Sequence, residues 1–113
     1  MSGAVETKQQ QTDQDSKIQD PNILAEEYFN IGRSLYKLGK YEDAIKNDNL
    51  AIKCKPKFAD AYNYYKGIIL SKLGRYQEAI QNYDLAIRYD LRFAEAYNNK
   101  GNSLNKLVNI KKQ

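Results

Sequence analysis

The chain has 113 residues, of which 42% are hydrophobic and 28% are charged, and its net charge is +4. This composition is typical of a small globular domain or a short repeat array. It contains no histidine and one cysteine, Cys54, which excludes a disulfide framework, a thiol cluster for zinc and the commonest general base. We therefore expect no catalysis, no cofactor and no metal. No run approaches the ~18 apolar residues of a membrane span, and no secretory signal begins the chain, so we expect a cytoplasmic protein, with a nuclear one as the alternative.

Charge and polarity set the first twenty residues apart. They carry two lysines and four acidic residues, so the excess of basic residues lies in the remainder of the chain. Residues 1–19 are rich in Gln and Asp, and Val5 and Ile18 are the only larger aliphatic residues among them. Because such a segment cannot bury enough apolar surface to offset its conformational entropy, we expect a disordered tail. The basic remainder is compatible with an acidic protein partner, with weak nucleic-acid binding or with a solvated lysine-rich surface.

Helical spacing begins after this tail. Asp20 and Pro21 form a helix-start pair, with a side-chain acceptor followed by a residue suited to the first turn. Apolar residues then recur every three or four positions up to Leu38, and Gly39 predicts the helix end. A second helix is expected over about 41–53, before Pro56.

The same unit then repeats. Residues 38–52 and 73–87 share nine identical positions and the conservative pair Lys40/Arg75. The repeat predicts helices over about 59–73 and 76–89, and a fifth helix from Arg92 or Phe93 to about 107. The chain is therefore expected to be all-α with five helices. Cys54 corresponds to Tyr89 of the second unit, so we expect it to be a partly buried packing residue.

These residues resemble the tetratricopeptide repeat family, whose pattern combines aromatic, glycine, leucine and alanine positions at a 34-residue period. The residues that carry the resemblance are Tyr28, Ile31, Gly32, Leu35, Ala44, Ala51 and Pro56 in the first repeat, Tyr62, Gly67, Leu70, Ala79, Tyr83 and Ala86 in the second, and Tyr97, Gly101 and Leu104 in the third. The resemblance implies a short right-handed α-solenoid of antiparallel helix pairs over residues 20–113. Its repeats would be about 25–58, 59–93 and a partial 94–113.

The chain departs from the family pattern in three places. Asp48 stands where the second aromatic residue belongs, which predicts a first repeat less stable than the second. The interval from Tyr62 to Gly67 is five residues, whereas the corresponding intervals of the other repeats are four. The extra residue predicts either a π-bulge within the helix or a loop that absorbs it. The third repeat lacks its second helix, which leaves an apolar stripe on the last helix and predicts self-association or a partner docking there.

The family binds peptides or partner helices in a groove lined by the first helix of each repeat. Projecting its positions onto this chain gives the groove candidates Glu26, Phe29, Arg33, Tyr36, Lys37, Tyr64, Ile68, Ser71, Lys72, Glu95, Asn98, Asn102, Asn105 and Lys106. The resemblance therefore implies a protein–protein interaction module. A solvated polar helix face is the alternative interpretation of the same residues.

Three other functions compete with this one. Relatives that bind the acidic tails of heat-shock chaperones use a clamp of Lys, Asn, Asn, Lys and Arg. The corresponding positions here are Phe29, Arg33, Tyr65, Glu95 and Asn99. None matches, which disfavours a chaperone tail. A basic helical-repeat RNA binder is a less favoured alternative, because two repeats would specify little sequence. The last alternative is a truncated or accessory fragment with no ligand of its own.

Overall fold

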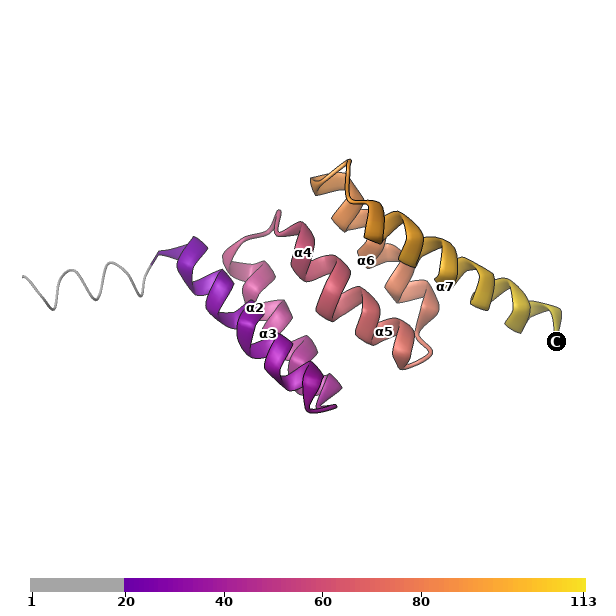
Figure 1. Ribbon diagram of the computed structural model, residues 1–113, viewed down its shortest axis with the longest axis horizontal. Helices are drawn as coiled ribbons and strands as arrows, with labels where there is room; N and C mark the ends of the chain where they lie inside the picture. The colour runs from indigo at the N-terminus through magenta and orange to yellow at the C-terminus, as the bar shows by residue number, and fades with distance from the viewer. Residues whose placement is uncertain (1–19) are drawn as a thin grey trace, which may run out of the picture.

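The computed structural model describes residues 20–113, so the predicted disordered tail lies outside the described residues. The helices are α2 (Pro21–Lys37), α3 (Tyr41–Cys54), α4 (Ala59–Ala61), η1 (Tyr62–Gly67), α5 (Ile68–Lys72), α6 (Tyr76–Tyr89) and α7 (Ala94–Lys112). Because α4, η1 and α5 follow one another without a break, they form one continuous helix. The described chain is therefore the expected set of five helices. In Figure 1, α2, α4–η1–α5 and α7 lie side by side in one layer, with α3 and α6 behind them.

The helix boundaries follow from local chemistry. The Asp20 carboxylate accepts a hydrogen bond from the Asn22 N–H at 2.9 Å, which caps the first turn of α2. Gly39 and Gly74 have φ of 76° and 79°, so each supplies the left-handed residue of a tight turn between antiparallel helices. One boundary was predicted wrongly: α7 ends at Lys112 instead of about residue 107. The repeat pattern stops there, but no glycine or proline follows to end the helix.

The extra residue of the second repeat forms a π-bulge. The Ile68 N–H donates to the Asn63 carbonyl, five residues earlier, and Tyr62–Gly67 is a π-helical turn. The structure therefore confirms the bulge and excludes the loop alternative. The wider turn buries the Asn63 side chain, whose Oδ1 accepts a hydrogen bond from Asn99 Nδ2 of α7 at 3.1 Å.

Small residues bring the helices close together. Ala44 and Ala51 of α3 and Ala79 and Ala86 of α6 are fully buried, seven residues apart within each pair. The apolar core consists of three small clusters, and Ile52 packs against the first two of them. Cys54 is half-buried against the first cluster, which confirms its predicted packing role.

Two of the three mid-helix glycines, Gly32 and Gly67, make room for one side chain of the following helix. A Cβ on Gly67 would lie 2.5 Å from Tyr83 Cε1 and 2.8 Å from the Tyr62 carbonyl oxygen. A Cβ on Gly32 would lie 2.9 Å from Asp48 Oδ1. Asp48 thus occupies, over Gly32, the place that Tyr83 occupies over Gly67. These contacts explain why glycine stands where it weakens an isolated helix.

Asp48 is buried without a hydrogen-bond partner. Its side chain is 0% exposed, and neither carboxyl oxygen has a partner among the described residues. Burial raises the pKa of Asp48 to about 8, although the charge of Lys66 opposes the rise. Asp48 is therefore largely protonated at neutral pH, because a buried unpaired carboxylate is costly.

Candidate peptide-binding face

Aromatic side chains connect the three helices of the front layer, whose exposed side we call the A-helix face. The aromatic row is Phe29, Tyr36, Tyr64, Tyr65 and Phe93. The Tyr65 ring lies 4.9 Å from the Phe29 ring and 5.6 Å from the Tyr36 ring. On the other side, the Tyr64 ring lies 6.1 Å from the Tyr65 ring and 5.8 Å from the Phe93 ring. All five rings are half-buried, so they are held by packing and still present apolar surface.

The π-bulge is what gives the row its continuity. Tyr65 reaches the aromatic rings of α2, and the next residue back, Tyr64, reaches Phe93 beside the start of α7. Adjacent residues of a regular helix point about 100° apart, and the wider π turn changes that spacing. Two consecutive tyrosines therefore bridge both gaps between the front helices.

Lysines border one edge of the A-helix face. Lys37, Lys72 and Lys106 lie at or near the carboxyl ends of α2, α5 and α7, and all three are exposed. Lys72 Nζ lies 5.9 Å from the centre of the Tyr36 ring, at the distance of a cation–π contact. Lys37 and Lys72, which are in the last turns of α2 and α5, also complement the negative ends of those helix dipoles.

Carboxylates border the opposite edge. Glu26, Asp60 and Glu95 lie in the first turns of α2, α4 and α7 or one turn further in. Partial burial raises the pKa of Asp60, and the negative charges of Glu26, Asp90 and Glu95 add to the rise. Each of these negative charges therefore disfavours the ionised form of Asp60. A hydrogen bond to Glu95 raises the pKa of Tyr64 to about 12, which connects this edge to the aromatic row.

The structure brings together part of the predicted groove set. Phe29, Tyr36 and Tyr64 lie in the aromatic row, and Ser71 Oγ lies 3.2 Å from Ser103 Oγ of α7. Ile68 is half-buried against the cluster of Leu70, Ala79 and Tyr83. The remaining candidates are exposed on their helices: Glu26, Arg33, Lys37, Lys72, Glu95, Asn98, Asn102, Asn105 and Lys106.

Sequence reasoning missed two members of the aromatic row, Tyr65 and Phe93. Phe93 immediately precedes α7 and was treated as a helix boundary. The family pattern assigns Tyr64 to the face and Tyr65 only to a clamp position. A signal was present, since a π-bulge in the helix allows two neighbouring residues to serve one face.

Deleting Tyr64 is expected to convert η1 into a regular α-helical turn, because the interval from Tyr62 to Gly67 then matches the other two repeats. The protein should stay folded with unchanged helical content by circular dichroism. The aromatic row would lose its connection to Phe93, so binding to the A-helix face should weaken. An unfolded deletion variant would show that packing requires the longer interval.

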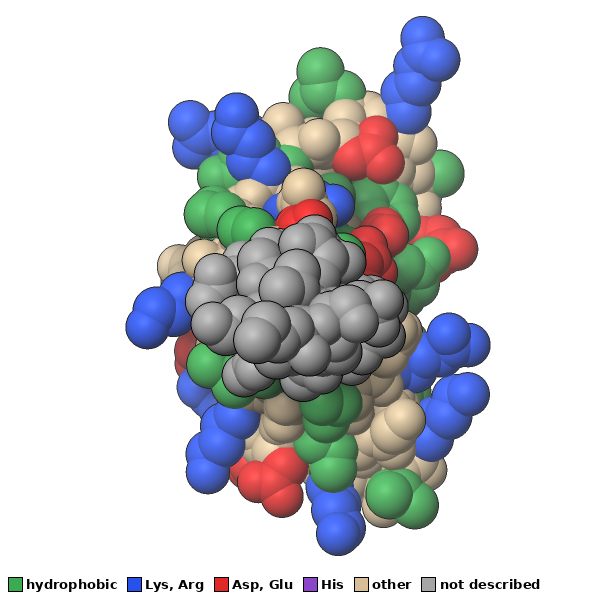
Figure 2. Space-filling model, turned by 90° about the vertical axis from the view of Figure 1, so that its left-hand side faces the viewer, with side chains coloured by type: hydrophobic (Ala, Val, Ile, Leu, Met, Phe, Trp, Pro, Cys, Tyr) green, Lys and Arg blue, Asp and Glu red, His purple; other side chains and the backbone are tan. Residues whose placement is uncertain are grey.

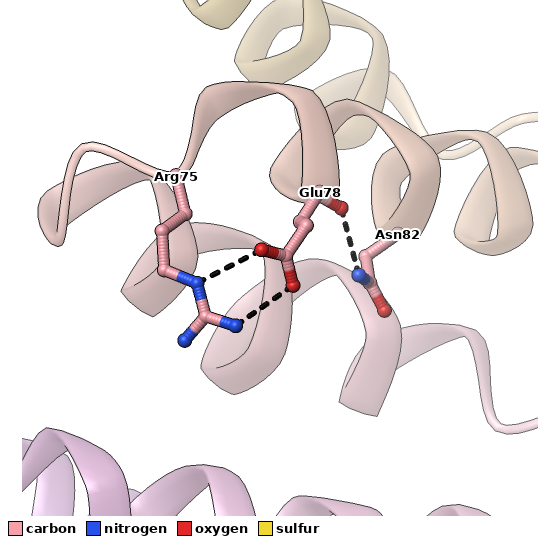
Figure 3. Close-up of polar contacts among 3 residues, drawn as sticks. All are labelled: Arg75, Glu78 and Asn82. Carbon is pink, nitrogen blue, oxygen red and sulfur yellow. Dashed lines mark hydrogen bonds and ion pairs between the residues drawn. The ribbon is translucent and has the colours of Figure 1, made fainter.

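A separate open hollow of about 360 Å³ lies at the start of α6, where its lining includes Arg75, Glu78 and Leu107. Figure 3 shows the polar contacts of two of these residues: Arg75 Nε and Nη2 donate to the two Glu78 carboxylate oxygens at 2.9 and 2.8 Å. The side-chain amide of Asn82, one turn further along α6, donates to the Glu78 carbonyl. The ion pair of Arg75 and Glu78 is exposed to solvent, and each side chain is the other's partner. It therefore stabilises the start of α6 only modestly. Within residues 20–113, no group of three His, Cys, Asp or Glu side chains is placed to hold a metal, and no helix is long and apolar enough to cross a membrane.

Comparison with known families agrees with this architecture. Residues 25–58 match a family model described as tetratricopeptide repeat, and residues 67–108 match one described as TPR repeat. The chain belongs to the tetratricopeptide repeat (TPR) family. TPR domains are non-catalytic protein-interaction folds, so this chain is a protein-interaction module. No curated protein matches its sequence.

Two solved TPR structures share the fold. The chain is 28% identical to a structure described as the TPR2B-domain:pHsp70-complex of yeast Sti1, with a TM-score of 0.72 over 75% of this chain and 67% of that one. It is 26% identical to MamA, with a TM-score of 0.73 over 80% of this chain. The match spans 52% of the MamA chain, so this protein corresponds to about half of that TPR structure.

Proposed function

We propose that this TPR protein binds an extended peptide segment of a partner protein across the A-helix face. The observation that carries the proposal is the aromatic row, because half-buried rings at contact distance connect all three front helices. A row of this kind supplies rigid apolar contact area at low entropic cost. The pHsp70 complex of the similar Sti1 domain supports a protein or peptide ligand.

The two edges of the face define the chemistry of the ligand. A peptide that crosses the three helices would place apolar or aromatic side chains against the aromatic row. Acidic side chains of the peptide would face Lys37, Lys72 and Lys106, and basic side chains would face Glu26, Asp60 and Glu95. Such complementary charges govern the orientation and the association rate more than the affinity. Glu95 would repel a ligand carboxylate on its own edge, which is why a chaperone tail remains disfavoured.

Nucleic acid is the less favoured ligand. On the end of the molecule shown in Figure 2, lysine and arginine side chains project at separate places around the outline, with acidic side chains between them. Binding to a phosphate backbone uses contiguous basic contacts and is strongly weakened by salt. A ligand held mainly by the aromatic row would be weakened only modestly by salt.

Selection from a displayed library of random peptides tests this function. Peptides that bind the wild-type chain should lose roughly tenfold or more affinity with Tyr64→Ser, and Lys72→Glu should slow their association and cause a smaller loss of affinity. The matched control is Lys46→Glu, which reverses an exposed charge on α3, behind the A-helix face. A site on the A-helix face would be contradicted if the control variant lost as much affinity, or if Tyr64→Ser left the affinity unchanged.

A further inference from the structure

Among residues 20–113, nothing covers the apolar outer face of α7. Tyr97, Leu104 and Val108 are 50%, 41% and 46% exposed, and they follow one another at helical spacing. Gly101 lies within this stripe, and a Cβ built on it would meet no atom within 4 Å. A mid-helix glycine costs roughly 1 kcal/mol relative to alanine, and at Gly101 no contact among the described residues accounts for that cost.

The equivalent surfaces of the first two repeats show what packs on such a stripe. Tyr62 and Leu70 of the second repeat are 7% and 2% exposed, and Gly67 is covered by Tyr83 of α6. In the first repeat, Gly32 is covered by Asp48 and by the Ala44 carbonyl, both of α3. In each repeat, the glycine is covered by an antiparallel helix that carries two small residues seven positions apart and a larger residue between them.

We propose that the outer face of α7 docks an amphipathic α-helix of a partner protein. This helix runs antiparallel to α7 and carries two small residues seven apart, with a larger side chain between them over Gly101. The surface, named the α7 stripe, consists of Tyr97, Gly101, Leu104 and Val108. It is distinct from the A-helix face, so both surfaces can act in one molecule.

Charge selects an acidic helix. After Glu95, the charged residues of α7 are Lys100, Lys106, Lys111 and Lys112, and Lys100 is already paired with Asp84 at 2.6 Å. An antiparallel helix begins beside the lysine-rich carboxyl end of α7. The internal helices at this place begin with acidic residues, Glu42 and Asp43 in α3 and Glu78 in α6. An acidic first turn in the docked helix would therefore meet Lys111 and Lys112, which are in the last turn of α7 beside the stripe; Lys106 lies on the opposite side of the helix.

A second copy of this chain fits the stripe less well. Its helices of the covering type, α3 and α6, are both already packed against their own repeats. The chain also carries a net charge of +4, so two copies repel each other where an acidic partner would be attracted.

A helical peptide with the sequence of α6 provides the probe, because it carries Ala79, Tyr83 and Ala86 in the required order. The peptide spans Tyr76–Tyr89, with the exposed positions 77 and 81 joined by a covalent staple so that it is helical before it binds. Titration of the isotope-labelled full chain should shift the α7 amide signals saturably. A stapled peptide of scrambled sequence should leave them unchanged.

Two variants and a control determine where the peptide binds. Leu104→Lys should weaken binding at least tenfold. Gly101→Ala should weaken it several-fold while it raises the melting temperature of the free chain, because the added methyl group meets nothing until a helix docks. Asn109→Ala, an exposed change on the same helix outside both the α7 stripe and the groove candidates, should leave binding unchanged. The inference is overturned if α7 shows no saturable shifts, if Gly101→Ala binds as tightly as wild type, or if sedimentation shows a dimer that Leu104→Lys dissociates.

Discussion

Replacing Asp48 by Asn is expected to remove most of the pH dependence of stability between pH 4 and 8. The Asp48 carboxyl has a pKa of about 8 in the folded chain and an ordinary value of 3.8 when exposed. As the pH rises, the unfolded chain therefore releases this proton first, so the free energy of unfolding falls across this interval and levels off above pH 8. A tenfold difference in proton affinity between the folded and unfolded chains corresponds to ~1.4 kcal/mol, so these two pKa values allow a total loss of up to roughly 6 kcal/mol.

Urea denaturation at a series of pH values measures this effect. The difference in stability between Asp48→Asn and wild type should grow steadily from pH 4 to 8. Glu27→Gln, which changes an exposed carboxylate on α2, is the control and should follow the wild-type profile. Parallel profiles for wild type and Asp48→Asn would mean that a partner or solvent already compensates the Asp48 charge.

The substitution Asp48→Tyr tests how well a larger side chain packs at the same site. Tyr83 fills the corresponding place over Gly67, so tyrosine at position 48 should raise the melting temperature, by a gain on the order of 1 kcal/mol or more. An unchanged or lower melting temperature would show that the first repeat has no room for the ring.

Alanine at the three repeat glycines should give graded effects on stability. Gly67→Ala would place a methyl group 2.5 Å from Tyr83 Cε1 and 2.8 Å from a backbone oxygen, so a loss of roughly 2–3 kcal/mol or more is expected. Gly32→Ala would meet the Asp48 side chain at 2.9 Å, and a side chain can shift more easily than backbone, so its loss should be smaller. Gly101→Ala meets nothing within 4 Å and should gain up to ~1 kcal/mol from helix propensity.

Thermal and urea unfolding of the three variants provides the comparison. The predicted order of stability, from lowest to highest, is Gly67→Ala, Gly32→Ala, wild type and Gly101→Ala. If Gly101→Ala were destabilising in the free chain, the outer face of α7 would have to be covered in solution.

The sequence predicted the helices well because local signals specify them. These signals are the spacing of apolar residues, the Asp20–Pro21 start and the turn glycines, and each of them acts over a few residues. The repeat also shows the apolar spacing and the turn glycine twice in one chain. The predicted end of α7 was wrong because the family pattern stops at about residue 107, and the loss of a family pattern does not end a helix. Nothing after residue 107 breaks the helix, and it continues to Lys112.

The candidate site was predicted less completely, because side-chain direction depends on where the extra residue is placed. Counting residues gives the number between Tyr62 and Gly67, but both a bulge and a longer loop satisfy that count. Only the π turn brings Tyr64 and Tyr65 to opposite gaps of one face. The burial of Asp48 was open for a similar reason, since an aspartate in an aromatic position is buried or exposed according to how closely the neighbouring helices pack.

Amide chemical-shift mapping with a library-selected peptide tests the central claim, peptide binding across the A-helix face, most directly. The predicted shifts cluster on Phe29, Tyr36, Tyr64, Tyr65 and Phe93 and on residues beside them, and the exposed sides of α3 and α6 should change little. Saturation should persist at high salt, because the aromatic row supplies most of the contact. Shifts confined to α3 and α6, or binding that high salt abolishes while the aromatic row stays unperturbed, would contradict the account.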